Sequence, residues 1–265
     1  MFRQRLLTSL ILVPLVLLAI YYANMWLLGT IIFALVIVGT WEWTQLIPIN
    51  YFVNKAIFIL MVLLTLELSK YWLDTWLVIG LLLWGLLLLA VLTFPASQTV
   101  WGRGYIVGGV CLVFLPLFAN TLAAIYEHPQ GKSLIVYLLC LVWATDIGAY
   151  LAGKRLGQHK LIPRVSPGKT IEGAVGGFLL ALLVAISGYF YFHPHSAVIW
   201  YVVAVAVTLI STVGDLLISM FKRRSKLKDT GQIFPGHGGV LDRLDSLIAA
   251  APLFYYGLSF LAIPS

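Results

Sequence analysis

Segment 219–246 carries most of the side chains in this sequence whose types and spacing suit chemistry, and it is the longest stretch without an apolar run. It contains three of the ten acidic residues, Asp229, Asp242 and Asp245. It also contains six of the seventeen basic residues, namely Lys222, Arg223, Arg224, Lys226, Lys228 and Arg243. Lysine and arginine are the usual ligands of phosphate groups, and carboxylates combined with phosphate oxygens suit Mg²⁺. The segment therefore indicates a site for phosphate-bearing molecules and a hard cation.

Further carboxylates lie in apolar segments. Asp215 and Asp146 are each near the predicted cytoplasmic end of an otherwise apolar helix, and an ionisable residue at that depth is a functional-site candidate. Asp242 and Asp245 have i, i+3 spacing and share one face at the start of the last predicted helix. Capping of that helix would explain one of them, but it would not explain Asp215 in the same layer. We expect Asp215, Asp242 and Asp245 to converge on Mg²⁺, with capping by one carboxylate as the alternative.

Glycines surround His237. Gly236, Gly238 and Gly239 allow a positive φ and a close approach of the backbone to a ligand. Because a predicted helix start follows them, they fit an anion-binding concavity, and a simple loop turn is the alternative. His237 suits a phosphate donor, a general acid or a structural role, and its position does not choose among these.

The second basic loop of the chain contains the sequence Gly168-Lys169-Thr170. A P-loop is excluded because Pro163 stands five positions before Gly168, where that motif has glycine, and because a predicted membrane helix precedes the segment in place of a strand. The segment still offers a lysine-bearing turn before a helix, which suits contact with phosphate. Ser166 and Thr170 are equally candidates for capping that helix.

The basic run from Lys222 to Lys228 and the acidic Glu42 each have a structural alternative. The run suits a phosphate clamp, but it also suits a juxtamembrane anchor on anionic lipid. Glu42 lies within the sequence WEWTQL at the predicted cytoplasmic layer, where a structural role is one reading of it.

The elements that must position these residues are membrane helices. The mean hydropathy is +0.98 and only 10% of the residues are charged, whereas soluble domains have about 25%. Long apolar runs without period-2 alternation favour helices over a barrel. Two cysteines give neither a disulfide framework nor zinc spacing. We predict an all-α polytopic membrane protein with one domain, 1–265, and cytoplasmic catalytic loops at about 153–170 and 222–245.

Nine transmembrane helices are expected. The first follows a short basic start and ends near Tyr22, and it resembles a signal peptide. No small-x-small cleavage site follows it, so we expect it to be retained as a helix. The other eight are expected at about 25–46, 55–70, 74–94, 105–126, 133–152, 171–192, 197–221 and 246–262.

The distribution of positive charge tests the helix count. With a cytoplasmic N-terminus and alternating helices, only Lys70 and Lys132 fall outside, and the other fifteen of the seventeen basic residues fall inside. The positive-inside rule therefore predicts that both basic loops are cytoplasmic and that the C-terminus is outside. Tryptophans near predicted helix ends fit an interfacial belt, namely Trp26, Trp41, Trp43, Trp72, Trp76, Trp101 and Trp200.

Taken together, these motifs resemble the signature of bacterial phosphatidate cytidylyltransferases, the CDP-diacylglycerol synthases. The resemblance rests on Ser219-x-Phe221-Lys222-Arg223, Lys228-Asp229-x-Gly231 and Pro235-x-His237-Gly238-Gly239-x-x-Asp242-Arg243-x-Asp245. The loop HKLIPRVSPGKT, the sequence from Asp146 to Tyr150 and Trp41-Glu42-Trp43 are similar to the same family. Three positions depart from it. Many members have Glu in place of Ile218, Ser or Thr in place of Ile147, and Trp in place of Ile171.

The resemblance implies a nucleotidyltransferase of phospholipid biosynthesis that converts CTP and phosphatidate into CDP-diacylglycerol and diphosphate. It implies Mg²⁺, a possible neighbouring K⁺, a homodimer and the cytoplasmic face of a bacterial inner membrane, with no nucleic-acid partner. By position, the metal ligands would be Asp215, Asp242 and Asp245. The other catalytic residues would be Lys222, Arg223, Lys228, Asp229, His237 and Arg243. Contacts with CTP and phosphate would come from Asp146, Ser166, Gly168, Lys169, Thr170, Gly238 and Gly239.

Two other functions are open at the level of sequence. A cytidylyltransferase for a different lipid phosphate would use the same motifs. An ion-coupled transporter would use the acidic residues within helices as an ion path. The transporter is disfavoured because the sequence shows no inverted repeat and no pair of broken helices, and because the acids gather at one face of the membrane instead of its midplane.

Overall fold

In the computed structural model, the described backbone comprises residues 2–234, 236, 238–261 and 263, and side chains are described for these residues except 2–7 and 9. The predicted roles of His237 therefore lie outside the described residues, as does Pro235 of the same motif.

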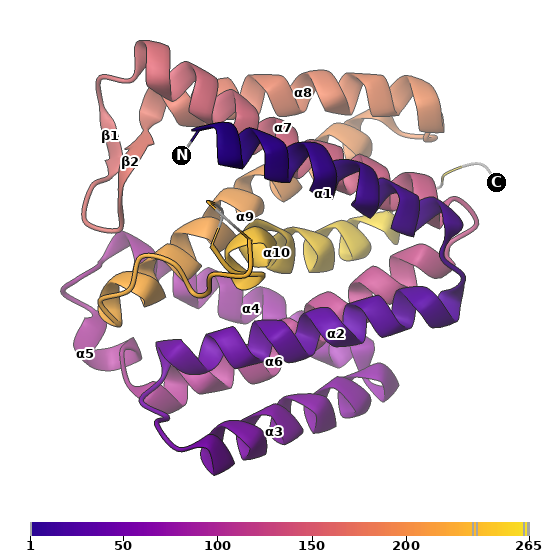
Figure 1. The fold of residues 1–265 in the computed structure, drawn as a ribbon. Coiled ribbons are helices and arrows are strands. Elements are labelled where there is room, and N and C mark those ends of the chain that lie inside the picture. Colours follow the sequence, from indigo (N-terminus) through magenta and orange to yellow (C-terminus); the bar gives the residue numbers. More distant parts are fainter. Residues whose placement is uncertain (1, 235, 237, 262, 264–265) are drawn as a thin grey trace.

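Long helices account for most of the described chain (Figure 1). Nine of them have 18 residues or more among the described residues, and each predicted apolar run corresponds to one. They are α1 (Phe2–Tyr22), α2 (Met25–Trp43), α3 (Phe52–Tyr71), α4 (Leu73–Leu92), α6 (Gly104–Glu127), α7 (Gly131–Leu156), α8 (Ile171–Phe192), α9 (Ala197–Arg224) and α10 (Leu241–Leu258). The short helices are η1 (Thr44–Leu46) and α5 (Gln98–Trp101). The helix α10 begins before the predicted residue 246, because its first turn is polar and an apolar run does not reveal it.

Seven of the long helices are apolar enough to cross a membrane, within the part of the chain that the structure describes. They are α2 together with η1, α3, α4, α6, α7, α8 and α9. The apolar part of α1, Leu10–Tyr22, is shorter, and α10 is not among the seven. The structure confirms an all-α polytopic membrane protein, while nine crossings and the predicted orientation of the termini stay predictions.

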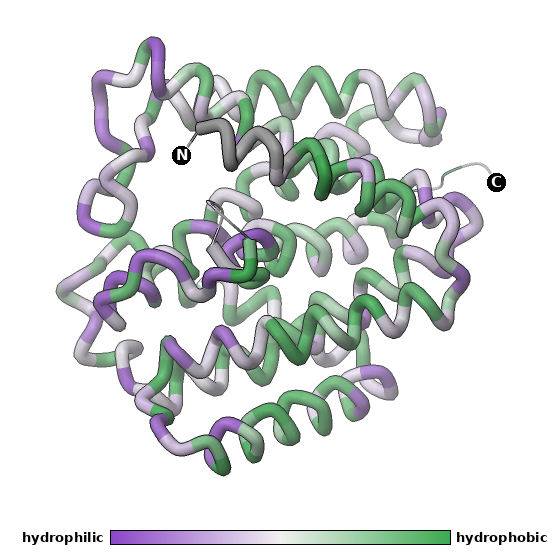
Figure 2. Tube along the Cα trace, viewed as in Figure 1, coloured by the Kyte–Doolittle hydropathy of each residue, from purple (hydrophilic) through white to green (hydrophobic). Residues whose placement is uncertain are grey.

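Successive long helices run back and forth between two ends of a bundle. The start of α1, the loop between α7 and α8 and the loop between α9 and α10 lie at the left-hand end in Figure 1. The connections from α1 to α2 and from α8 to α9 lie at the opposite end. Hydrophilic residues gather in these connections, and hydrophobic residues cover the helices (Figure 2). Both basic loops therefore share one end of the bundle, as the charge distribution predicts.

The helices α7 and α8 pack with their backbones in contact. A Cβ atom at Gly148 would lie 2.5 Å from the carbonyl oxygen of Gly176 and 2.9 Å from the Cα of Gly177. Small residues at such positions allow membrane helices to approach closely. This contact fixes the relative positions of α7 and α8, the two helices that the second basic loop connects.

That loop contains an antiparallel hairpin, which the sequence did not predict. The strands are β1 (Lys160–Ile162) and β2 (Ser166–Thr170), with Lys160 opposite Thr170. The Glu172 carboxylate accepts hydrogen bonds from the backbone N–H groups of Gln158 and His159 at the base of the hairpin. Thr170 caps α8 by accepting from the Gly173 N–H, which is the capping role considered for it. These hydrogen bonds hold the base of the hairpin against the first turn of α8.

Three of the tryptophans assigned to an interfacial belt are in the core instead. Trp43, Trp101 and Trp200 are buried. The Trp43 indole donates to the Val107 carbonyl oxygen at 3.0 Å, and the Trp200 indole donates to the Ala185 carbonyl oxygen at 2.8 Å. A buried tryptophan is stable when its N–H finds an acceptor, so proximity to a helix end did not distinguish these side chains from interfacial ones.

Candidate active site

Close packing of α9 on α10 brings two of the predicted carboxylates together. A Cβ atom at Gly214 would lie 2.5 Å from the carbonyl oxygen of Asp245 and 2.9 Å from the Ala249 Cβ. The absence of a side chain at Gly214 therefore lets the first turns of α10 rest on the α9 backbone. Asp215, the next residue of α9, consequently lies beside Asp245.

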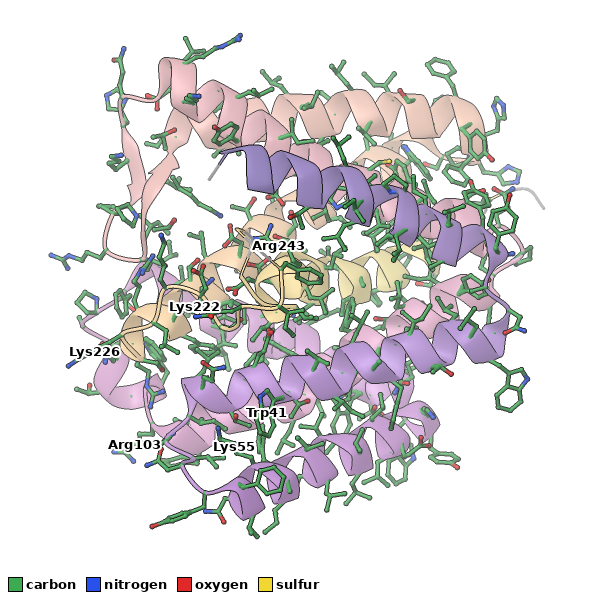
Figure 3. All side chains as sticks on the ribbon, in the orientation of Figure 1. Trp41, Lys55, Arg103, Lys222, Lys226 and Arg243 are labelled. Atoms are coloured by element: carbon green, nitrogen blue, oxygen red, sulfur yellow. The ribbon has the colours of Figure 1, made fainter. Side chains whose placement is uncertain are left out.

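These carboxylates line a cavity of about 270 Å³ at the end of the bundle that carries the basic loops. Its lining residues come from α7, α9, α10 and the loop before α10, and they are Asp146, Asp215, Lys222, Asp229, Asp242, Arg243, Asp245 and Ser246. Figure 3 labels Lys222 on α9 and Arg243 on α10, both beside the loop that joins the two helices. Seven of the eight lining residues are among the predicted site residues, and Ser246 is an addition.

Asp242 is fully engaged by protein donors. Its Oδ1 accepts from the Lys222 Nζ at 2.7 Å, and its Oδ2 accepts from the backbone N–H groups of Thr230 at 2.8 Å and Gly239 at 2.9 Å. The side chains of the ion pair are only 10% and 3% exposed. Burial opposes ionisation of Asp242, but the Lys222 ammonium and the two amide donors outweigh it, so the pKa of this carboxyl lies below its usual value. Asp242 therefore orders the loop as an anion.

Asp215 joins the second basic loop to the cavity. Its Oδ2 lies 2.6 Å from the Nζ of Lys169, which belongs to β2, and its Oδ1 accepts from the Ser219 hydroxyl at 3.2 Å. The two side chains of the ion pair are about one quarter exposed, so Lys169 can still exchange partners with an incoming phosphate. The structure thus places Lys169 against a carboxylate that lines the cavity, although Lys169 is not itself a lining residue.

Asp245 and Asp146 have fewer protein donors. Asp245 accepts from the Ser246 N–H at 2.8 Å, whereas among the described residues the Asp146 carboxylate interacts with Asp215, Lys169 and Arg243 through charge and not through hydrogen bonds. Burial raises the pKa of Asp245 well above its usual value, and the neighbouring negative charge of Asp215 raises it further against the opposing effect of Lys222. This end of the cavity therefore favours a bound cation.

The carboxylates fit Mg²⁺ when phosphate completes its coordination. Within the described residues, no three acidic, histidine or cysteine side chains gather closely enough to hold one ion by themselves. Proteins commonly bind Mg²⁺ through one or two carboxylates, several waters and substrate phosphates. Asp215 and Asp245 are hard oxygen donors of that kind, whereas Asp242 would join them only after Lys222 had moved away.

Arg223 positions a loop in this structure. Its Nε donates to the Val165 carbonyl oxygen at 3.3 Å, and its Nη1 lies 3.4 Å from the Leu227 carbonyl oxygen. Val165 is buried, so the contact anchors the tip of the hairpin beside α9. The predicted site residues that are described but do not line the cavity are Arg223, Lys228, Ser166, Gly168, Lys169, Thr170, Gly238 and Gly239.

The glycines before α10 form a tight turn. Gly236 has φ of 76° and Gly238 has φ of 83°, as expected for positions that favour glycine. The Phe234 N–H donates to the Gly238 carbonyl oxygen at 2.9 Å across this turn. The turn directs the Gly239 N–H to Asp242, and its predicted binding of an anion stays a prediction.

Sequence reasoning missed two polar contributors to the site and underestimated Glu42. Thr230 and Ser246 are small polar residues in a polar segment, which gave no signal beyond that of a loop. Glu42 is buried at the end of α2 and contacts the loop before α10, and an acidic residue in so apolar a helix was a usable signal. Ile218, a departure from the family pattern, is buried in the hydrophobic core.

Replacing Gly214 with alanine should disrupt the site without unfolding the bundle. The added methyl group must push α10 away from α9, which separates Asp215 from Asp245. Because misplacement by about 1 Å can cost on the order of 10²-fold in rate, we expect a loss of that size in the enzymatic rate of the purified protein. Gly85→Ala is the matched control, since a Cβ atom there meets nothing within 4 Å. Full activity of Gly214→Ala would contradict the packing argument.

The fold and the site define a class of polytopic helical membrane proteins in which carboxylates, a lysine and an arginine line a cavity at one end of the bundle. The chain belongs to the cytidylyltransferase family, whose model matches residues 3–261.

Curated relatives cover almost the whole chain. A protein from Haemophilus influenzae named phosphatidate cytidylyltransferase is 37% identical over 286 residues, covering 97% of this chain and 98% of the relative. A protein of the same name from Pseudomonas aeruginosa is 38% identical over 276 residues, covering 96% of each chain. The similarity thus extends over the helices as well as the motifs, in agreement with the resemblance noted in the sequence.

Proposed function

We propose that this protein transfers the cytidylyl group of CTP to phosphatidate, which gives CDP-diacylglycerol and diphosphate. The observation that carries the proposal is the cavity in which Asp215, Asp245, Lys222 and Arg243 meet at one end of a membrane bundle. Such a site suits a reaction between a water-soluble polyanion and a lipid whose acyl chains stay in the bilayer. The names of the relatives support the same substrates.

In the proposed reaction, a phosphate oxygen of phosphatidate attacks the α-phosphorus of CTP. A new bond forms between that oxygen and the α-phosphorus, and the bond from the α-phosphorus to the bridging oxygen breaks, so diphosphate leaves with the bonding electrons. A phosphate monoester has its second pKa near 6, so the nucleophile is already an anion at neutral pH and needs no dedicated base. The ammonium groups of Lys169 and Lys222 and the Arg243 guanidinium reduce repulsion between the two substrates and stabilise the leaving group.

Asp215 and Asp245 would hold the Mg²⁺ ion, and Asp242 would be a third ligand if Lys222 released it. When bound, Mg²⁺ would supply Lewis-acid stabilisation of charge on the phosphate oxygens. These carboxylates would fix the position of the ion, and Lys169 and Lys222 would bind phosphate oxygens after leaving their carboxylate partners. A K⁺ ion next to Mg²⁺ is part of the proposal on the strength of the sequence resemblance.

Removal of divalent ions should abolish the activity. We expect diphosphate release to fall to background when EDTA is present and to return when Mg²⁺ is added in excess, because uncompensated carboxylates would repel the triphosphate. The measurement is the initial rate of diphosphate release in detergent at several Mg²⁺ concentrations. Undiminished release in EDTA after exhaustive dialysis would contradict the metal assignment.

We further propose that the cavity faces the cytoplasm from a bacterial inner membrane and that the protein is a homodimer. The support for the orientation is that both basic loops lie at one end of the bundle (Figure 1), in accord with the positive-inside rule. The support for the dimer is the family resemblance. Labelling of cysteines introduced into the hairpin, in intact and in opened cells, tests the orientation, and the mass of the detergent-solubilised protein tests the dimer.

The reaction is tested by diphosphate release from purified protein with CTP, phosphatidate and Mg²⁺, with the other nucleoside triphosphates as controls. Release that requires phosphatidate and prefers CTP would support the proposal. Release with a different lipid phosphate but not with phosphatidate would replace the acceptor. If folded protein released no diphosphate with any lipid phosphate, the proposed reaction would be overturned. An ion-coupled transporter would then be the remaining alternative.

A further inference from the structure

Glu42 is a buried carboxylate that the proposed reaction does not use. It lies in the last turn of α2 and is 2% exposed. Its Oε1 accepts from the Val240 N–H at 3.0 Å, and its Oε2 accepts from the Leu241 N–H at 2.7 Å. The Thr230 hydroxyl lies 3.4 Å from the same Oε2. These partners lie in the loop before α10 and at the first residue of α10, almost two hundred residues away in the chain.

These contacts complete the start of α10. The first amide groups of a helix have no acceptor within the helix, and a negative charge near them is favourable. Val240 occupies the N-cap position of α10 and provides no capping side chain. Glu42 therefore supplies from another helix the acceptor that the local sequence lacks, while Asp242 accepts from the Gly239 N–H.

The backbone of the loop is shaped around this carboxylate. A Cβ atom at Gly239 would collide with both carboxylate oxygens of Glu42, and a Cβ atom at Gly231 would collide with Oε1. Two separate turns of the loop thus approach Glu42 as closely as only glycine allows. The same two glycines belong to the motifs from which the site was predicted.

The end of α2 is itself firmly held. The Trp43 indole donates to the Val107 carbonyl oxygen at 3.0 Å, and Arg224 at the end of α9 donates to the Leu46 carbonyl oxygen at 2.8 Å. Glu42 therefore sits on a platform that is anchored to α6 and α9. Because the end of α2 is held in place, the hydrogen bonds of Glu42 also hold Val240 and Leu241 in place.

We propose that Glu42 is a positioning residue for cytidylyl transfer, holding the start of α10 so that Asp242, Arg243 and Asp245 face the cavity. This inference rests on the proposed function for its kinetic consequence, but its structural part is independent of the reaction. It goes beyond stabilisation of the fold, because the hydrogen bonds of the Glu42 side chain go to the loop, whereas α2 is held in the core by apolar residues such as Leu28, Ile32 and Val36.

The test compares Glu42→Gln with Thr40→Val. Glutamine keeps the size of the side chain but has one acceptor oxygen, and its amide group would face a backbone N–H. Thr40 is equally buried on α2, and its hydroxyl donates to the Val36 carbonyl oxygen of its own helix, its one partner among the described residues. We expect Glu42→Gln to lower kcat by about 10²-fold, with the unfolding temperature close to that of wild type, and Thr40→Val to leave kcat unchanged.

Hydrogen exchange gives a second readout that needs no catalysis. In Glu42→Gln we expect faster exchange of the Val240 and Leu241 amides, while amides in the middle of α6 and α9 keep their wild-type rates. Loss of kcat together with uniformly faster exchange and a lower unfolding temperature would mean a general structural role and would overturn the proposal. An unchanged kcat in a folded variant would overturn it as well.

The wild-type protein provides a check if Glu42→Gln does not fold. The Val240 and Leu241 amides should be protected in the absence of substrates, at the level of a helix interior. Exchange as fast as that of the exposed Gln232 and Ile233 would show that Glu42 does not hold this segment. These measurements separate failure of the positioning role from failure of the proposed reaction, which would instead appear as the lack of diphosphate release in wild type.

Discussion

Asp215→Asn should reduce diphosphate release from CTP and phosphatidate by about 10³-fold, the largest loss expected for a single substitution in this protein. The change removes a negative charge that pairs with Lys169 and also acts on Asp245, so the proposed Mg²⁺ loses a ligand and Lys169 loses its partner. Asparagine has nearly the same shape as aspartate, so packing of α9 on α10 is preserved. The measurement is kcat at saturating CTP in detergent with excess Mg²⁺.

The matched control is Asp74→Asn. Asp74 is in the first turn of α4, at the end of the bundle opposite the cavity (Figure 1). We expect this variant to retain wild-type kcat, since its charge lies far from the substrates. Substantial activity of Asp215→Asn, with Asp74→Asn unchanged, would show that the carboxylate at Asp215 does not take part in the reaction.

Lys222→Met should destabilise the loop before α10 and abolish most of the activity. It leaves the Asp242 carboxylate buried without its cation, and breaking a buried pair by removing one partner costs roughly 3–5 kcal/mol. The pKa of Asp242 is then expected to rise, since burial is no longer outweighed. The measurement is the unfolding temperature in detergent together with the rate of diphosphate release.

The matched control is Lys70→Met, which removes the lysine of an exposed ion pair instead of a buried one. Lys70 and Glu67 form a pair at 2.7 Å whose side chains are 50% and 61% exposed, and exposed pairs contribute about 0–1 kcal/mol. We expect little change in stability or activity for this variant. If Lys222→Met were as stable and active as Lys70→Met, the buried pair would not organise the site.

The helices could be predicted from the sequence because their cause is local. An apolar run of about twenty residues has to satisfy its own backbone in lipid, and each predicted run corresponds to one long helix. The cavity was also predictable in part, since Asp242 and Asp245 are adjacent on one helical face and Asp215 is an ionisable residue in an apolar helix. Helix connectivity then required both basic loops to be at one end.

The partner of each charged side chain could not be predicted, because it depends on contacts between distant segments. Lys169 reaches Asp215 only because the second basic loop folds into a hairpin, which no periodicity in that short segment indicated. Glu42 could be recognised as an unusual residue, but its partners are 198 and 199 positions away. The interfacial prediction for Trp43 and Trp200 is wrong because nearness to a helix end does not reveal which face of the helix other helices cover.

The connection between α9 and α10 has no regular secondary structure over most of its length, yet its described residues are fastened at several points. Asp242 holds Thr230 and Gly239, and Glu42 holds Val240 and Leu241. Ordering a residue of the backbone costs about 1–2 kcal/mol of conformational entropy, and this connection meets that cost when the protein folds. Substrates that arrive at the cavity therefore meet these four residues already ordered, and a larger share of the interaction energy is available to bring two phosphates together.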